Sequence, residues 1–198
     1  MIIGIAGYTG SGKSTCARML CGEGCAIIDG DAEGKRVMQS DPAIKGELAE
    51  TFGSEVIGDD GIRFEILSDK VFRDLRSLVA LNAIVHPRLL TVVKESINRS
   101  SAKRVILDAA LIPLWEIESW FDTCVWIDTP FQLRLQRLRE KYPQKNDLDL
   151  RLRMDMQTRI FSPPEGSGWI TIDNSKDLDN LKKHTMEIDF SGQKQRKD

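Results

Sequence analysis

One stretch of the sequence has residue types and a spacing that predict phosphate binding. It is Gly7-Tyr8-Thr9-Gly10-Ser11-Gly12-Lys13-Ser14, here called the phosphate loop, and it fits the pattern G-x-x-x-x-G-K-[S/T]. Glycines let backbone N–H groups close around phosphate oxygens without a Cβ in the way. The Lys13 ammonium can reach the β- and γ-phosphates of a nucleotide, and the Ser14 hydroxyl can ligate Mg²⁺, with Thr15 beside it.

The segments on either side of the phosphate loop support this interpretation. Residues 1–6 form an apolar, β-branched run that is typical of a buried parallel strand. Residues 14–20 have the pattern of a helix start, and a helix N-terminus adds partial positive charge. An ordinary glycine-rich turn is the alternative, and the agreement of strand, loop and helix disfavours it.

Two carboxylates follow the next predicted strand. Residues 25–28 predict a short buried strand that ends in Asp29-Gly30-Asp31. Ligands of open α/β sheets sit beyond the carboxyl ends of the strands, so both aspartates are expected on the rim that carries the phosphate loop. There Asp31 could act as a general base. Alternatively, Asp31 caps the helix expected over residues 32–39, a common role for aspartate. The sequence leaves both roles open.

A third carboxylate, Asp108, ends the buried strand predicted over residues 105–108. An apolar strand that ends in an acid resembles a Walker B strand, whose aspartate holds Mg²⁺ directly or through water. Further strands are expected over residues 124–128 and 169–172. The pattern thus predicts an α/β protein whose acidic strand ends share one rim.

Residues 40–100 have a different character, because no strong strand pattern occurs in them. Helical spacing of apolar residues predicts helices over 43–52, 64–72 and 78–85, with an interruption at His86-Pro87 and a further helix over 89–97. A turn is expected at residues 58–61. We interpret this region as a helical insertion between two strands of the sheet, placed to cover an acceptor substrate.

Two arginine-rich helices are predicted near the C-terminal end, over residues 131–141 and 150–161, with a polar break between them. Solvated basic faces would explain these arginines. The interpretation we prefer is a closing lid that brings an arginine to a transferring phosphoryl group.

Composition limits the classes of function. A chain of 198 residues suits one α/β domain, and a net charge of −2 with a pI near 5.8 argues against a nucleic-acid-binding face. The four cysteines, Cys16, Cys21, Cys25 and Cys124, lack C-x-x-C spacing and histidine companions. We expect free, mostly buried thiols in a reducing cytoplasm, and a zinc site is the alternative. No apolar run approaches about 18 residues, so we expect no membrane segment and a cytoplasmic protein.

Several segments together match one family in order. Besides the phosphate loop they are Ile28-Asp29-Gly30-Asp31, Arg63 with Leu67 and Val71-Phe72, Leu81 to Pro87, Gln132 with Arg139, Arg153 to Gln157, and Ile172-Asp173-Asn174. Through them the chain resembles dephospho-CoA kinases, the enzymes of the last step of coenzyme A synthesis, from Met1 to about Leu181.

The resemblance implies a three-layer P-loop kinase fold with a parallel five-stranded sheet, a helical acceptor-binding insertion and a helical lid. It also implies one domain over residues 1–198. Its core would be about 1–31, 103–130 and 162–190, its acceptor region about 32–100 and its lid about 131–161.

The resemblance further implies the reaction: ATP with Mg²⁺ phosphorylates the ribose 3′-hydroxyl of 3′-dephospho-CoA. Small molecules would be the only partners, with no nucleic acid and no membrane, and the enzyme would be a monomer or weak homo-oligomer. The residues carried over are catalytic Asp31, Lys13 and Arg139; ATP-binding Gly10, Ser11, Gly12, Lys13, Ser14, Thr15 and Asn174; acceptor-binding Asp31, Arg63, His86 and Asp108; and metal-binding Ser14 and Asp108.

The chain departs from the family pattern in three places. Gly30 replaces an alanine, the segment after Asp108 lacks the first proline of a P-L-L sequence, and the stretch between Arg139 and Arg153 is longer than usual. His86 is either a core histidine or a group that orients Asp31 or binds acceptor phosphates.

Two other functions fit the phosphate loop. One is a kinase of another small acceptor, such as a nucleoside or nucleotide, which the segments 63–72 and 81–87 argue against. The other is a nucleotide-binding regulator without turnover. Lys13, Ser14 and Asp31 together favour catalysis, and a guanine-reading N-K-x-D is absent from the sequence.

Overall fold

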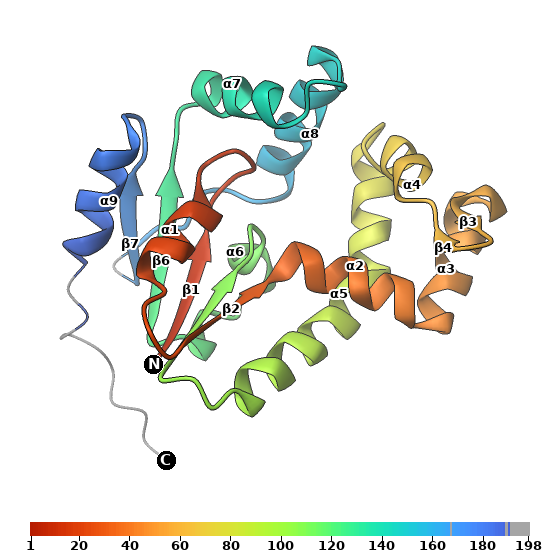
Figure 1. Ribbon diagram of the computed structural model, residues 1–198. Coiled ribbons are helices and arrows are strands. Elements are labelled where there is room, and N and C mark those ends of the chain that lie inside the picture. Colours follow the sequence, from red (N-terminus) through yellow and green to blue (C-terminus); the bar gives the residue numbers. More distant parts are fainter. Residues whose placement is uncertain (167, 189, 191–198) are drawn as a thin grey trace. The chain divides into compact units, whose positions relative to one another are not determined.

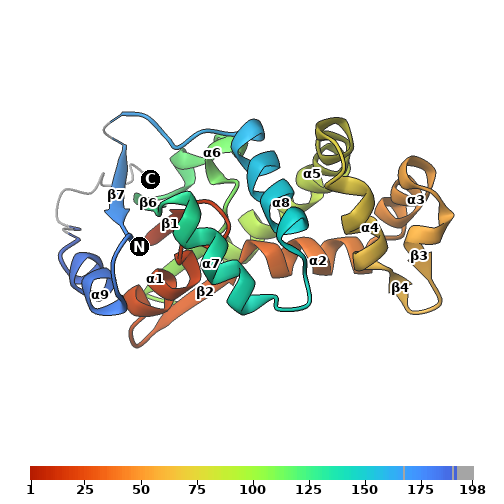
Figure 2. The ribbon, with the colours of Figure 1, turned by 90° about the horizontal axis from the view of Figure 1, so that it is seen from above.

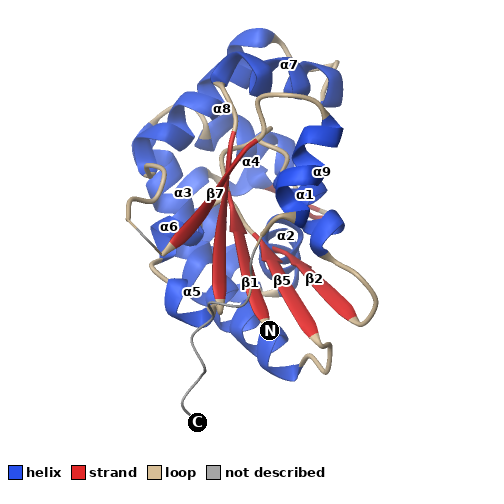
Figure 3. Ribbon diagram, turned by 90° about the vertical axis from the view of Figure 1, so that its left-hand side faces the viewer, coloured by secondary structure: helices blue, strands red, loops and turns tan. Residues whose placement is uncertain are grey.

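A parallel sheet organises the first of the two compact units into which the chain divides, Met1–Asp29 together with the chain from Ser100 onward. The structure is a computed structural model that describes residues 1–166, 168–188 and 190. The strand order is β2-β5-β1-β6-β7, and every neighbouring pair is parallel (Figures 1 and 3). The strands are β1 (Ile2–Ala6), β2 (Cys25–Asp29), β5 (Arg104–Asp108), β6 (Thr123–Asp128) and β7 (Trp169–Asp173).

The burial of the strands follows their place in the sheet. All of β1 is buried, as expected for a central parallel strand that is covered on both faces. β2 forms where the sequence predicts it, but the expectation that it is buried is wrong. It is an edge strand, and Ile27 is 39% exposed, because β2 has a strand neighbour on one side alone.

Helices cover both faces of the sheet. α1 (Lys13–Leu20) and α9 (Leu178–Met186) pack together on one face, and the short α6 (Ile112–Trp115) contacts β1 from the other, followed by the 3₁₀ turn η2 (Glu118–Trp120) (Figure 2). The core under α1 and α9 includes Ile3 and Ile5 of β1, Ala17 of α1, Ile127 of β6 and Leu181 of α9. This packing fixes the direction in which α1 leaves the phosphate loop.

A helical hairpin follows β6. α7 (Phe131–Lys141) and α8 (Asp147–Ile160) enclose a small core of Leu135, Leu138, Leu150 and Met154. Both helices and the break between them agree with the sequence. α8 begins earlier than predicted because the Asn146 side chain accepts a hydrogen bond from Asp149 N (2.9 Å) and caps the helix.

The second unit, Gly30–Arg99, is mainly helical. It contains α2 (Gly30–Ser40), α3 (Pro42–Phe52), the 3₁₀ turn η1 (Ser54–Val56), α4 (Phe64–Val71) and α5 (Leu75–Arg99), and α2, α3 and α4 all pack against α5. The predicted turn at 58–61 joins two short antiparallel strands, β3 (Ile57–Gly58) and β4 (Gly61–Ile62), which the sequence analysis missed because two residues are too few for a periodic pattern. The number of domains stays a prediction.

The predicted interruption at His86-Pro87 is wrong, since α5 runs through Pro87 as one helix. Proline inside a helix removes one backbone hydrogen bond and costs about 3 kcal/mol. Burial of an apolar stripe along the whole helix offsets that cost: Leu78, Val85, Leu89, Val93 and Ile97 are all buried.

α5 is also the one described helix whose length and mean hydropathy, 1.2 over an 18-residue window, would suit a membrane span. It packs against α2, α3 and α4.

The expectation of free thiols is wrong for two of the four cysteines. Cys21 and Cys25 form a disulfide across the turn between α1 and β2, where their Cα atoms lie 5.3 Å apart, within the range that a disulfide requires. Cys16 and Cys124 are free and buried as expected. Burial raises the pKa of Cys16 to about 11 and that of Cys124 to about 12, so both stay protonated at neutral pH.

Candidate active site

The carboxyl ends of the strands bring the predicted site residues of the first unit to one rim. Asp29 pairs with Asp108, Ile5 pairs with Asp108, and Asp128 pairs with Asp173, so the strands end level with one another. The phosphate loop leaves β1 at this rim. Asp108 is buried, at 6% exposure, whereas Asp29, Asp128 and Asp173 are exposed.

Two glycines of the phosphate loop have conformations and neighbours that a side chain would not tolerate. Gly12 precedes α1 with φ 98°, and a Cβ there would lie 2.4 Å from Asn174 Nδ2. Gly10 has φ 77°, and a Cβ there would lie 2.9 Å from the Arg134 carbonyl oxygen. Both positions therefore require glycine, because the loop lies against β7 and α7 as well as adopting a left-handed backbone.

The outer side of the phosphate loop is held at one carbonyl. Ser11 O accepts hydrogen bonds from Asn174 Nδ2 (2.7 Å), Thr129 Oγ1 (2.9 Å) and Arg137 Nη1 (3.4 Å). Arg137 Nη2 also donates to Asn174 O (3.2 Å). The predicted ATP-binding residue Asn174 therefore contacts the loop through its side chain, and Thr129 and Arg137 join it there.

The groups predicted to contact nucleotide phosphates and metal lie at the start of α1. Lys13 Nζ donates to Tyr8 O (3.3 Å), which places the ammonium over the loop. Ser14 is exposed, and Thr15 Oγ1 accepts from Arg18 Nη2 (3.4 Å). The described residues include no cluster of three or more His, Cys, Asp or Glu side chains that could hold a metal ion. The two predicted metal-binding residues, Ser14 and Asp108, suit Mg²⁺, which commonly takes one or two protein oxygens and completes its shell with phosphate and water.

A buried cluster supports the loop at Tyr8. The Tyr8 ring lies 5.2 Å from that of Trp126 and 5.1 Å from that of Phe161, and its hydroxyl donates to Phe161 O (3.1 Å). The Arg134 guanidinium lies 4.9 Å from the centre of the Tyr8 ring and donates to Thr129 O (3.1 Å). Burial lowers the pKa of Arg134 and raises that of Tyr8, so both keep their ordinary charge at neutral pH.

α8 contacts the loop as well. Gln157 Oε1 accepts a hydrogen bond from Thr9 N at 2.7 Å. The loop is therefore bound on one side by α7 and on another by α8.

The lid arginines divide into inner and outer ones. Arg134 is only 4% exposed and Arg137 is half-buried beside the loop. Arg139 is exposed and forms an ion pair with Asp147 of α8, which raises the pKa of Arg139 and lowers that of Asp147. The catalytic role of Arg139 stays a prediction. Two other arginines of α7 contact the loop in this structure, Arg134 at the Tyr8 ring and Arg137 at Ser11 O.

The remaining predicted residues belong to the second unit. Asp31 lies in the first turn of α2, which begins at Gly30, so the alternative that Asp31 caps a helix starting at residue 32 is wrong. Arg63 precedes α4 and is exposed. His86 lies in α5, where burial lowers its pKa to about 4. A neutral imidazole offers no positive charge to acceptor phosphates, which favours the core role of His86.

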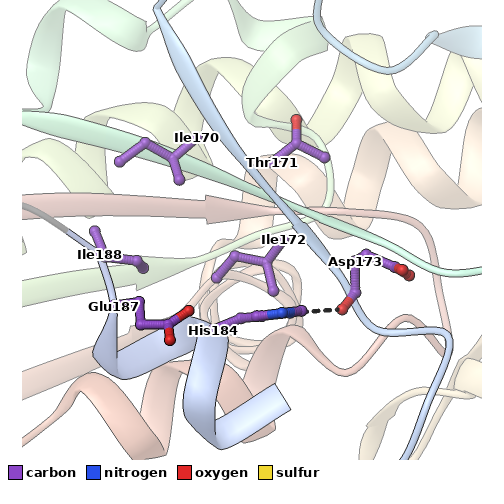
Figure 4. A pocket seen from close by; sticks show the side chains of 7 residues that line it. All are labelled: Ile170, Thr171, Ile172, Asp173, His184, Glu187 and Ile188. Atoms are coloured by element: carbon purple, nitrogen blue, oxygen red, sulfur yellow. Dashed lines mark hydrogen bonds between the residues drawn. The ribbon is translucent and has the colours of Figure 1, made fainter. Parts of the chain in front are cut away.

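A pocket of about 440 Å³ lies between β7 and α9 (Figure 4). Its polar groups include Asp173, Glu187 and His184, whose Nδ1 lies 3.4 Å from Asp173 O. Hydrogen bonds from the Ser175 hydroxyl and N–H lower the pKa of Asp173. Two carboxylates disfavour an anionic occupant, so we assign the phosphates to the phosphate loop.

Comparison with known proteins agrees with this geometry. The family model for dephospho-CoA kinase matches residues 1–179. The chain belongs to the dephospho-CoA kinase family.

A dephospho-CoA kinase of Corynebacterium glutamicum is 32% identical over 193 residues, covering 94% of this chain and 96% of the relative. The enzyme of Fusobacterium nucleatum subsp. nucleatum is 26% identical, covering 91% and 93%. The predicted family is thereby confirmed, and with it a transferase that uses ATP and Mg²⁺.

Solved structures agree with the fold of the family. The crystal structure of TT1252 from Thermus thermophilus is 26% identical with a TM-score of 0.67, covering 92% of each chain. The dephospho-CoA kinase from Campylobacter jejuni has a TM-score of 0.58 at 15% identity, covering 94% of each chain, which bears on the fold alone. The predicted α/β kinase fold with its five-stranded parallel sheet is confirmed.

Sequence reasoning missed four groups at the phosphate loop, Thr129, Arg134, Arg137 and Gln157. Thr129 was not singled out, although a polar residue directly after a buried strand at the binding rim is a usable signal. Arg134 and Arg137 were not distinguished from the other arginines of the predicted lid, and Gln157 entered only through the family resemblance. Their roles depend on contacts between distant segments, which the sequence pattern of a single element does not contain.

Protonation of His86 is expected to destabilise the protein as the pH falls. The pKa of His86 is about 4 in the folded chain and about 6.5 in an unfolded chain, so the unfolded state binds more protons between these values. Stability from this group is present above about pH 6.5 and is lost toward pH 4. Linkage gives about 2.5 kcal/mol between pH 7.5 and 4.5.

The measurement is urea unfolding at both pH values for the wild type and His86→Asn. The wild type should lose about 2.5 kcal/mol more than the variant, the amount that linkage assigns to His86. His184→Asn, at a half-buried histidine of α9, is the control for loss of an imidazole and should show the pH dependence of the wild type. Equal pH dependence in all three proteins would contradict the assignment of a buried neutral His86.

Proposed function

We propose that this chain transfers the γ-phosphoryl group of ATP to the ribose 3′-hydroxyl of 3′-dephospho-CoA, giving coenzyme A and ADP. Membership of the dephospho-CoA kinase family supports the reaction, and the geometry of the phosphate loop carries it. The enzyme would act in the cytoplasm on small molecules, without nucleic acid or membrane, as a monomer or weak homo-oligomer.

The residues of the phosphate loop bind the triphosphate. We place the backbone N–H groups of Gly10 and Gly12 toward it, whereas the Ser11 N–H donates to Tyr8 O (3.1 Å). The N-terminus of α1 is also suited to an anion. Lys13 stabilises negative charge on the transferring group. Ser14 and Asp108 would hold Mg²⁺, which supplies charge neutralisation between the β- and γ-phosphates when bound.

Asp31 is the proposed base, and Arg63 and Asp108 are proposed to bind the acceptor. His86 is left out of this set, because its neutral imidazole favours a core role. Asp31 follows the carboxyl end of β2 by two residues along the chain, which supports a place at the rim. Phosphoryl transfer depends more on positioning and charge compensation than on a strong base. Asp31 therefore needs only to orient the hydroxyl and take its proton late.

Steady-state release of ADP tests the reaction. With ATP and Mg²⁺, dephospho-CoA should support turnover, whereas adenosine and AMP should not. Lys13→Ala should lower kcat by about two orders of magnitude or more, because a preorganised charge that meets the transition state is lost. Lys183→Ala, at an exposed lysine of α9, is the control. Turnover with a rival acceptor alone would contradict the assignment of dephospho-CoA as the acceptor. ATP binding without any phosphorylated acceptor would favour a nucleotide-binding regulator without turnover.

Asp31→Asn separates catalysis from helix stabilisation. If Asp31 is the base, Asp31→Asn should lower kcat by about 10²–10⁴-fold, because the proton acceptor is lost, and should leave ATP affinity nearly unchanged. Loss of a negative charge in the first turn of α2 should cost only about 0.3–1 kcal/mol of stability. Measuring kcat and thermal stability on the same protein distinguishes the two.

Glu33→Gln removes a second acid from the same turn and should keep full activity. A fully active Asp31→Asn enzyme would exclude the catalytic role, and Asp29→Asn then tests the neighbouring carboxylate.

Arg139→Ala should lower kcat with less effect on the KM for the acceptor, since an arginine that meets developing charge acts mainly in the transition state. Its partner Asp147 provides the control: Asp147→Ala breaks the same exposed pair but leaves the arginine in place, and should retain most of kcat. Normal kcat in Arg139→Ala combined with a crippled Arg137→Ala would transfer the role to Arg137.

A further inference from the structure

The Ser11–Gly12 peptide is held from outside the phosphate loop by more donors than an ordinary carbonyl receives. Asn174, Thr129 and Arg137 all donate to Ser11 O, from β7, β6 and α7 respectively or the residues directly after them. Asn174 is 4% exposed and Thr129 is 5% exposed. These three side chains, with Ser11 O, are here called the Ser11 clamp.

Planarity of the peptide bond gives the clamp a consequence on the other side. In a trans peptide the N–H of one residue points opposite to the carbonyl of the residue before it. With Ser11 O directed at the clamp, Gly12 N–H is directed toward the inside of the loop. No hydrogen bond from Gly12 N–H occurs among the described residues. The clamp thus leaves a fixed donor facing the expected position of the phosphates.

The glycine and the clamp depend on each other. A Cβ at residue 12 would lie 2.4 Å from Asn174 Nδ2, so the amide can reach Ser11 O only because residue 12 is glycine. The backbone of Asn174 is fixed in turn, since its N–H donates to Asp128 O (2.8 Å) and extends the β6–β7 ladder. The clamp is therefore anchored in the sheet and does not depend on the ligand.

We propose that Thr129, Asn174 and Arg137 are positioning residues that aim Gly12 N–H at a β-phosphate oxygen of the nucleotide. This inference rests on the proposed function only in requiring that the chain bind ATP. It assigns a role to Thr129, and it places Asn174 behind the loop, acting through the peptide. The chemical group recognised is a diphosphate or triphosphate, independent of the base.

Thr129→Val tests the clamp with an isosteric change that removes the hydroxyl. Calorimetric titration should show ADP and ATP binding weakened by about 3- to 10-fold, the loss of one ordinary hydrogen bond. Inorganic tripolyphosphate should lose affinity by the same factor, and adenosine should lose none. The KM for dephospho-CoA should stay unchanged, and Thr129→Ser, which keeps the hydroxyl, should restore nucleotide affinity.

Thr185→Val is the matched control, because Thr185 is a buried threonine of α9 whose hydroxyl donates to Leu181 O (2.7 Å). It should leave the affinities for ADP, ATP, tripolyphosphate and adenosine at their wild-type values. Asn174→Asp replaces the donor by an acceptor that faces Ser11 O. It should weaken ADP binding more than Thr129→Val does.

The outcomes separate this inference from the proposed function. Wild-type ADP affinity in Thr129→Val, or an equal loss in Thr185→Val, overturns the clamp. Weaker adenosine binding in Asn174→Asp overturns it too, since Asn174 would then contact the base. If the wild-type chain binds ADP and tripolyphosphate but does not phosphorylate dephospho-CoA, the proposed substrate is wrong. The same titrations then still test the clamp.

Discussion

The site depends on the parallel pairing of β1 with β5 on one side and β6 on the other. Pairing of Ile5 with Asp108 and of Ala6 with Trp126 sets the carboxyl ends level, so the phosphate loop leaves β1 between Asp108 and Thr129. A slip of one residue in either pair would turn each side chain to the opposite face of the sheet. The core under α1 and α9 opposes such a slip, because Ile3, Ile5 and Ile127 would leave it. Apolar packing therefore sets the positions of polar groups that it does not touch.

The rim poses an electrostatic problem, since four of the five strands end in aspartate while the ligand is an anion. Three of these carboxylates are exposed, where water and salt screen them. Asp108 is the buried one, and it is also the one proposed to hold the metal ion. Binding by backbone N–H groups needs no net positive charge, which fits a chain whose formal charge is −2. In the proposed mechanism, Lys13 then stabilises the charge that develops during transfer.

The sequence was sufficient for features that are local in the chain. The phosphate loop, the strands and the lid helices follow from glycine spacing, β-branched runs and helical periodicity. Three features were not predictable in that way. The position of β2 at the edge of the sheet depends on strand order, continuity of α5 through Pro87 depends on packing along its whole length, and the Cys21–Cys25 bond depends on a Cα separation of 5.3 Å. At the site, Ser11 O collects donors from segments more than 100 residues away, which no local pattern indicates.

The lid hairpin is held unequally along its length. Near the phosphate loop, Arg134 and Arg137 of α7 and Gln157 of α8 make buried or half-buried hydrogen bonds, and the Arg134 carbonyl packs against Gly10. At the far end, Arg139 and Arg151 pair with Asp147 in the open, and exposed pairs of this kind contribute about 0–1 kcal/mol. The small core around Leu138 and Leu150 keeps the two helices together. If Arg139 meets the transferring phosphoryl group as proposed, it exchanges a weak carboxylate partner at the tip of the hairpin and leaves the contacts that shape the loop in place.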